Sequence, residues 1–271
     1  MLSVRGQRHS NNWSETLEQP VRDTRTTGRR HKSSNIARSR SETLEQLGRD
    51  TRRTLLSLDL PEMEIMHQIT LGKSVVAVGH HHGKEVDLSK HEFENEAAIL
   101  QELSPRKQSE WLASRELLFR IASLPKRVEC LYDDFGKPYL RGNDKLISVS
   151  HSEKWAAAMV SDRSCGVDIQ VYTKTVERIA NRFLSEEEMN AKSEIKNKLH
   201  HLHLLWGAKE CMYKAYGKKR LEFRKHIYIP SINTGQCTAV GEIRYEEIHL
   251  LYNIHYRILP EAAWVFCIEK E

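Results

Sequence analysis

Long apolar runs, paired cysteines and a strong charge of one sign are all missing from this 271-residue sequence. No run of eighteen apolar residues occurs, which excludes a membrane-spanning helix. The N-terminal residues are hydrophilic throughout, so we expect no signal peptide. The cysteines favour reduced thiols in the cytoplasm over a disulfide framework, because they are single, widely spaced and odd in number. They are Cys130, Cys165, Cys211, Cys237 and Cys267.

The charge balance and the missing motifs narrow the possible functions. The sequence has 42 basic and 37 acidic residues and a net charge of +5, a mild preference for anionic partners but not the excess of a nucleic-acid binder. Neither a glycine-rich phosphate loop nor a G-x-S-x-G motif is present. The histidines at 80–82 and at 200, 201 and 203 lack cysteine or carboxylate partners at zinc spacing.

Residues 1–62 differ from the rest of the chain because they contain hardly any aromatic residues and no sustained apolar period. Such a segment cannot bury enough surface to offset the entropy of ordering. Two related copies begin at Ser14 and Ser41, too few and too polar for a solenoid. We predict a disordered or partly helical leader; alternatively, the leader is not native and the protein begins at Met63 or Met66.

The remaining sequence mixes helix and strand patterns. Helices are predicted over 89–103 with Ser89 as cap, over 104–124 with Ser104 as cap, from Ser185 as a capping box with Glu188, and around Trp206. Strands are predicted at 73–80, within 129–140, and in the closing segments 226–230, 241–259 and 262–270. Residues 144–172 predict a strand, a short helix, a turn and a strand. Because the pattern lacks regular βαβ alternation, we expect an α+β fold.

Three short segments carry polar residues that could form a functional site, although each also has an ordinary structural explanation. In "CGVDIQ", alternation puts Asp168 and Gln170 on one strand face, which is also typical of an ordinary solvated face. In "WGAKECMYKAYGKK", Glu210 and Lys214 are one helical turn apart, beside Lys209, and an ordinary surface ion pair has the same spacing. In "ISVSHSEKW", residues 150–152 precede the predicted short helix, where they can bind an anion or simply cap the helix.

Taken in order, "FGKPYL", "ISVSHSEKW", "CGVDIQ", "RFLSEEE" and "WGAKECMYKAYGKK" resemble the 4′-phosphopantetheinyl transferase superfamily, specifically its surfactin-synthetase-type members with two similar halves. The resemblance covers roughly residues 104–229. It implies transfer of the phosphopantetheine arm of coenzyme A to a serine of an acyl- or peptidyl-carrier protein, with release of 3′,5′-ADP. It also implies two pseudo-twofold α+β halves, 63–146 and 147–271, in a monomer whose central cleft binds coenzyme A and Mg²⁺.

The resemblance also implies roles for individual residues. Asp168 and Glu210 match the magnesium-binding acids, and Mg²⁺ usually takes one or two carboxylates together with substrate phosphates. Glu210 also matches the proposed general base, and Lys214 the lysine that stabilises or protonates the leaving group. Lys209 would contact phosphate or hold the Glu210 carboxylate. The remaining matches concern the nucleotide phosphates: Ser150 and His151 for the 3′-phosphate, with Lys137, Arg115, Lys107 and Arg106 as basic residues around it.

Two departures from the family pattern are visible. Gln170 occupies a position that is often acidic, so we expect two carboxylates on the metal, with Gln170 coordinating weakly or supporting a water. Lys219 replaces a glycine in the loop that would meet the carrier protein. An alternative is a degenerate, non-catalytic member that binds a carrier protein or coenzyme A. Another Mg²⁺-dependent phosphoryl-transfer enzyme is also open, whereas nucleic-acid and membrane partners are not expected.

Overall fold

The computed structural model describes residues 62–82, 93–191, 193–218 and 220–271. The chain divides into two units, Met1–Arg49 and Asp50–Glu271, and every described residue belongs to the second. The predicted leader up to residue 61, the predicted cap Ser89 and the departure at Lys219 lie outside the described residues.

The first sheet has the strand order β1-β2-β6-β5-β4-β3, and all of its pairs are antiparallel. Its strands are β1 (Glu62–Leu71), β2 (Ser74–His82), β3 (Cys130–Tyr132), β4 (Pro138–Leu140), β5 (Leu146–Ser152) and β6 (Trp155–Ser161). β5 and β6 therefore belong to this sheet, although the predicted boundary at 146/147 assigned them to the second half. The sheets change between Ser161 and Cys165.

The second sheet has the order β7-β11-β10-β9-β8 and is also antiparallel. Its strands are β7 (Cys165–Val171), β8 (Ile227–Asn233), β9 (Thr238–Tyr245), β10 (Ile248–Ile258) and β11 (Ala262–Glu269). Two antiparallel sheets with separate helices confirm the predicted mixture of α and β structure. The closing strands lie in or next to the segments predicted for them, except that the predicted segment 241–259 forms two strands, β9 and β10.

The helices are α2 (Glu94–Gln101), α3 (Pro105–Ala122), α4 (Thr175–Phe183), α5 (Glu186–Asn190), α6 (Lys198–Tyr216) and α7 (Phe223–His226). Pro105 opens α3 as predicted, but the Ser104 side chain forms no capping hydrogen bond. The predicted capping box is present at α5, where Ser185 and Glu188 bond each other's backbone N–H groups. Among the described residues, no helix is both long and apolar enough to cross a membrane.

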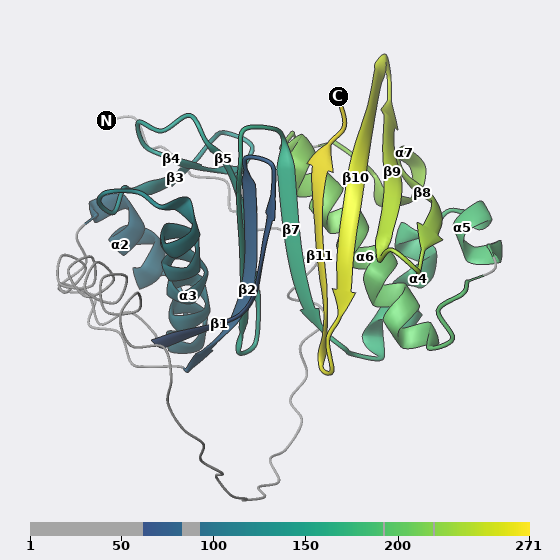
Figure 1. Cartoon of the computed structure of the whole chain (residues 1–271), viewed down its shortest axis with the longest axis horizontal. Helices are drawn as coiled ribbons and strands as arrows, with labels where there is room; N and C mark the ends of the chain where they lie inside the picture. The colour runs from purple at the N-terminus through teal and green to yellow at the C-terminus, as the bar shows by residue number, and fades with distance from the viewer. Residues whose placement is uncertain (1–61, 83–92, 192, 219) are drawn as a thin grey trace, which may run out of the picture. The chain divides into compact units, whose positions relative to one another are not determined.

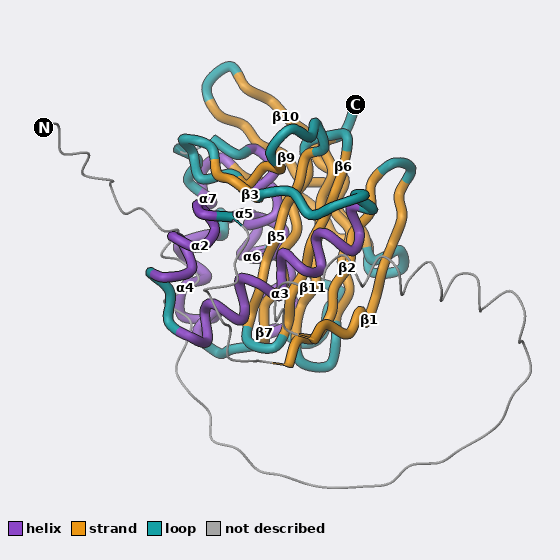
Figure 2. The backbone as a smooth tube through the Cα atoms, turned by 90° about the vertical axis from the view of Figure 1, so that its left-hand side faces the viewer, coloured by secondary structure: helices purple, strands orange, loops and turns teal. Residues whose placement is uncertain are grey.

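Three apolar cores define the layers of the second unit. One core joins α3 to the first sheet, through residues such as Leu117 and Ile147. A second lies between the sheets, where Val78 and Met159 meet Trp264. The third joins the other face of the second sheet to α4 and α6. The order is thus helix, sheet, sheet, helix, and Figures 1 and 2 show α3 crossing the first sheet.

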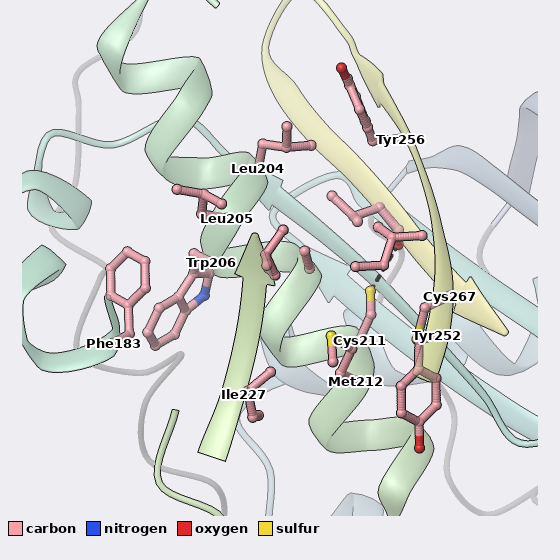
Figure 3. Packing of buried hydrophobic residues seen from close by; sticks show 14 of the residues in the cluster. Phe183, Leu204, Leu205, Trp206, Cys211, Met212, Ile227, Tyr252, Tyr256 and Cys267 are labelled. Atoms are coloured by element: carbon pink, nitrogen blue, oxygen red, sulfur yellow. Dashed lines mark hydrogen bonds between the residues drawn. The ribbon is translucent and has the colours of Figure 1, made fainter. Parts of the chain in front are cut away.

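The third core is built around α6. Trp206 meets the Phe183 ring edge-on, with 5.0 Å between the ring centroids, and Figure 3 shows this pair beside Leu205. Met212 and Tyr252 are fully buried on the same side of the sheet. This packing holds α6 against the second sheet, so its polar residues have defined neighbours.

The segment after Ser152 corrects one prediction. It was expected to form a short helix, but it turns at Glu153, which has a φ of +52°, and returns as strand β6. β6 pairs with β2 on one side and β5 on the other, and every residue in it is buried. Its alanines are compatible with a helix or a strand, and pairing with the two neighbouring strands stabilises the strand. Ser150 and His151 therefore lie in a hairpin and not at a helix N-terminus.

Side chains of β5 join the two sheets. β7 is an edge strand of the second sheet, so alternate backbone N–H groups have no strand partner. Serine hydroxyls of β5 accept them: Ser148 from Val167 N at 3.0 Å, Ser150 from Ile169 N at 3.4 Å, and Ser152 from Val171 N at 3.2 Å. We call these three residues the serine ladder. The period of two in "SVSHS" matches the period of the strand it faces.

Candidate active site

Helix α6 approaches the second sheet closely at two glycines, facing β7 at Gly166 and β11 at Gly207. A side chain on Gly166 would place its Cβ 1.9 Å from the Cys211 carbonyl oxygen of α6. A Cβ on Gly207 would lie 2.9 Å from Cγ2 of Val265, and 3.5 Å from Oδ2 of Asp168. Larger residues at either position would push the helix away from the strand. The two glycines thus let polar groups of α6 reach Asp168.

Asp168 is the centre of this contact. It is 2 % exposed, and its Oδ1 accepts hydrogen bonds from Lys214 Nζ at 2.7 Å and from Ser150 Oγ at 2.8 Å. Its Oδ2 is buried and has no hydrogen-bond partner. Val167 and Ile169 point into the core between the sheets, as alternation predicted. A buried carboxylate oxygen without a donor is costly unless another group binds it.

Glu210 and Lys214 share this environment. Burial raises the pKa of Glu210; Lys214 opposes that shift, and the negative charge of Asp168 adds to it. Burial alone would lower the pKa of Lys214, but Asp168 and Glu210 outweigh it and raise the value. No described residue forms a hydrogen bond to the Glu210 carboxylate. Lys214 forms an ion pair with Asp168, and the charges of both affect the pKa of Glu210, so the three groups lie in one electrostatic environment. Two acids that share one lysine favour a further cation.

Asp168 and Glu210 are the acids at this contact that could hold Mg²⁺. No group of three or more histidine, cysteine, aspartate or glutamate side chains suited to a metal occurs in the part of the chain that the structure describes. The assignment of the two carboxylates as metal ligands therefore stays a prediction. Mg²⁺ is commonly bound by one or two carboxylates plus substrate phosphates and waters. The unpartnered Oδ2 of Asp168 is the direct sign that such an ion fits.

Gln170 lies two residues beyond Asp168 on β7 and pairs with Ala263 of β11. It is half-buried, and its side-chain amide forms no hydrogen bond to any described residue. Alternation along the strand puts it on the same face as Asp168. This placement leaves the predicted supporting role of Gln170 a prediction.

The structure does not bring Lys209 to this site. Its ammonium is fully buried and donates to Glu188 Oε2 at 2.7 Å, Ile227 O at 2.6 Å and Phe223 O at 3.1 Å. All three of its donor positions are therefore used on the side of α6 that faces α5, α7 and β8. The predicted contact with phosphate or with the Glu210 carboxylate is corrected, because consecutive helix residues point in different directions.

His151 lies next to Ser150 in the sequence but faces α3. Its Nδ1 is 3.2 Å from Oε2 of Glu110, a carboxylate that is 1 % exposed. The same carboxylate lies 2.9 Å from Arg106 Nε and 3.2 Å from Lys107 Nζ. The predicted phosphate ligands His151, Lys107 and Arg106 are thus brought together around an acid that the sequence analysis did not single out.

Arg115 and Lys137 lie apart from this group. The Arg115 guanidinium is buried over the Trp111 ring, 3.8 Å from its centroid, and donates to Ser114 Oγ at 2.9 Å and to the Tyr132 hydroxyl. Lys137 donates to the Ala215 carbonyl at 2.7 Å, in the last turn of α6, and burial lowers its pKa. Arg115 therefore packs inside the first layer, and Lys137 ties the β3–β4 turn to the end of α6.

Sequence reasoning missed three features of the site. Glu110 lies in a strongly helical segment and reads as one acid among several. Gly166 and Gly207 matter through an approach between strand and helix that only the fold creates. The serine ladder had a signal, because serine recurs at every second position from 148 to 152. That spacing could have predicted a face of hydroxyls on a strand.

Comparisons with known proteins agree with this geometry. The pattern of the 4′-phosphopantetheinyl transferase superfamily matches residues 164–267, which include Asp168, Glu210 and Lys214. Over 111 residues the chain is 27 % identical to the 4′-phosphopantetheinyl transferase gsp of Aneurinibacillus migulanus. That alignment covers 40 % of this chain and 46 % of the relative, so the chain spans less than half of the protein it matches. Residues 164–267 are thus similar to the 4′-phosphopantetheinyl transferase superfamily, in agreement with the family resemblance drawn from the sequence motifs.

Proposed function

We propose that this protein transfers the 4′-phosphopantetheine group of coenzyme A to a serine of an acyl- or peptidyl-carrier protein in a Mg²⁺-dependent reaction. One observation carries the proposal. Asp168, Glu210 and Lys214 meet where α6 crosses β7, and one Asp168 oxygen has no partner. One lysine does not balance the charge of two carboxylates. A metal ion bound to a diphosphate would supply the missing positive charge.

The reaction assigns a task to each side chain. The carrier serine oxygen forms a bond to the phosphorus that bears the pantetheine arm, and the bond from that phosphorus to the oxygen of 3′,5′-ADP breaks. The serine proton passes to the Glu210 carboxylate, directly or through a water. Lys214 offsets the negative charge that collects on the leaving 3′,5′-ADP, since its pKa is raised and its ammonium stays charged.

Asp168 and Glu210 would hold the metal ion. When bound, Mg²⁺ supplies charge neutralisation for the diphosphate. Ser150 supports the arrangement from the other sheet, because its hydroxyl donates to Asp168 and its oxygen lies 3.2 Å from Lys214 Nζ. Ser150 therefore restricts where the Asp168 carboxylate can point, which leaves Oδ2 as the free oxygen.

The finer parts of the proposal concern the surroundings of the site. His151, Lys107 and Arg106 would receive the 3′-phosphate of coenzyme A, in a cleft between two related halves. The proposal also includes that the protein acts as a monomer in the cytoplasm. Support comes from the two helix-covered sheets and from the position of His151 beside Ser150.

The deciding experiment is intact-protein mass spectrometry of an apo acyl-carrier protein incubated with this protein, coenzyme A and Mg²⁺. We expect a mass gain of one phosphopantetheine group, abolished by EDTA. A carrier whose serine is replaced by alanine is the matched control and should gain nothing.

Gln170, in place of a frequent acid, favours a second candidate, a binding protein without turnover. It predicts that calorimetry detects coenzyme A binding while several different carriers gain no mass. That outcome would contradict the transferase proposal.

A further inference from the structure

Glu110 is a buried acid surrounded by bases. Its side chain is 1 % exposed, and its two oxygens lie 2.9–3.2 Å from nitrogens of Arg106, Lys107 and His151. Arg106 and Lys107 reach it from the preceding turn of α3, whereas His151 reaches it from β5. An acid in this position has been withdrawn from water, so its contacts must stabilise the charged form.

The charge state of the group supports that description. Burial alone would raise the pKa of Glu110, but His151, Lys107 and Arg106 outweigh burial and bring the pKa down to about 2. His81 of β2 is a further neighbour, and burial lowers its pKa, which favours a neutral ring. Its Nε2 lies 2.9 Å from the Glu153 carbonyl oxygen. The basic groups nearest the Glu110 carboxylate are therefore Arg106, Lys107 and His151.

The contact determines how His151 presents itself. Nδ1 lies within ion-pair distance of Glu110 Oε2, at 3.2 Å, but without the geometry of a hydrogen bond. Nε2 lies on the opposite side of the ring, and no described residue bonds to it. His151 is 28 % exposed, so the ring is open to a ligand. A neighbouring carboxylate restricts the orientation of the ring, as second partners of functional histidines commonly do. A ring held in this way presents Nε2 to a ligand.

Strand β5 links this group to the acid pair. Ser150 points to Asp168, and His151, one residue later, points to Glu110. Alternate directions along one strand thus place the two contacts on opposite sides of β5. A ligand with two separated phosphate groups could meet both.

We propose that Glu110 is a positioning residue that holds His151 for the 3′-phosphate of coenzyme A. This inference rests on the proposed function, and it adds a residue that touches no substrate. It predicts that the Glu110 carboxylate matters only for ligands that carry the 3′-phosphate. Dephospho-coenzyme A lacks that group, so it separates a role of Glu110 at the 3′-phosphate from a general role in binding or folding.

The test is calorimetric binding of coenzyme A and of dephospho-coenzyme A, which needs no turnover. Glu110→Gln should weaken coenzyme A binding about tenfold, the scale of one charge-assisted hydrogen bond. Its affinity for dephospho-coenzyme A should change less than about twofold. His151→Ala should behave in the same way. The double variant should match His151→Ala, because Glu110 acts through that ring.

Glu116→Gln is the matched control. Glu116 lies on the same helix, is 7 % exposed, and pairs with Arg120 at 2.5 Å, away from His151. It should leave the affinity for both ligands unchanged. If Glu110→Gln does not fold, Glu110→Asp keeps the charge on a shorter side chain and should show a smaller loss for coenzyme A alone.

Several outcomes would overturn the inference. Equal losses for both ligands would show a general structural role for Glu110, and an unchanged affinity for coenzyme A would show no role. Additive effects in the double variant would mean that Glu110 acts through Arg106 and Lys107. Failure of the unaltered protein to bind coenzyme A would instead overturn the proposed function, so the two failures are distinguishable.

Discussion

Two neighbouring residues of α6, Lys209 and Glu210, lead to opposite kinds of polar environment. On one side, Lys209 and Glu188 form a closed network: the ammonium has three acceptors, and Glu188 accepts from Ser185 N and Ile229 N as well. On the other side, Glu210 shares Lys214 with Asp168, and an Asp168 oxygen has no donor. The first network is complete within the described chain, and the second is not.

The difference separates stability from function. Buried polar groups in folded proteins almost always have partners, so a complete network explains itself by the structure that it holds together. An incomplete one persists where a ligand provides the missing interaction. Lys209 therefore ties α5, α6, α7 and β8 together, whereas the proposed function leaves the acid pair for a metal ion and substrate. The predictions below test this division, beginning with the largest effect.

Removing one charge from the incomplete side should abolish most of the activity. Asp168→Asn keeps an acceptor for Ser150 and Lys214 but loses the negative charge. We expect carrier modification to slow on the order of 10³-fold, the scale of charge-stabilising groups in phosphoryl transfer. Initial rates at saturating Mg²⁺ measure it, with the thermal midpoint as the folding control. A rate within about twofold of that of the unaltered protein would contradict a role for Asp168 in the reaction.

Breaking the complete side should cost stability. Lys209→Met leaves the Glu188 carboxylate buried without its cation, and such losses cost about 3–5 kcal/mol in the free energy of unfolding. Urea denaturation measures this. Adding Glu188→Gln removes the unpaired charge while keeping an acceptor for Ile229 N, so the double variant should recover part of the loss. Native stability combined with lost activity in Lys209→Met would break the comparison, because it would place Lys209 at the substrate.

The Glu110 group extends the comparison to acid conditions. The pKa of Glu110 falls from 4.5 to about 2 on folding, so its contribution is present above pH 4.5 and is lost as the pH falls toward 2. Over this pH range, we expect the free energy of unfolding to fall by up to about 3 kcal/mol more in the unaltered protein than in Glu110→Gln. Denaturation at a series of pH values measures the difference. Parallel curves for the two proteins would show that the carboxylate is not stabilised in the folded state.

The smallest expected effect comes from adding a third acid beside Asp168 and Glu210. Gln170→Glu should lower the Mg²⁺ concentration needed for half-maximal activity by a few-fold, since a further carboxylate strengthens a hard-cation site. The rate at saturating Mg²⁺ should stay the same. A magnesium titration of both proteins tests this. An identical titration would place residue 170 outside the metal environment.

Sequence reasoning succeeded where one element carries the signal alone. The helix opened by Pro105, the capping box at Ser185 and the alternation around Asp168 each follow from local rules, and the structure confirms all three. The acid pair was proposed from the family resemblance, in which a strand motif and a helix motif each carry an acid. Its closeness depends on Gly166 and Gly207, whose importance appears only when the two elements meet.

The failures have a common physical cause. Residues 155–161 form a strand because β2 and β5 flank them, which an alanine-rich segment cannot reveal. Lys209 was grouped with Glu210 because the two are adjacent in sequence, although they face different partners. The family resemblance implied that Arg115 lies near the nucleotide phosphates, yet the ring of Trp111 and the Tyr132 hydroxyl hold it inside the first layer. Each error concerns a contact between distant segments.

The serine ladder makes the site depend on the union of the two sheets. The segment that matches the family, 164–267, contains both acids, but its edge strand β7 has backbone N–H groups whose acceptors are the hydroxyls of β5, outside that segment. Separated from β5, this segment would expose a row of unpaired donors, and Asp168 would lose Ser150. The same contacts therefore fix Asp168 and protect a sheet edge, and a chain that fails to dock its two sheets would leave that edge open to aggregation.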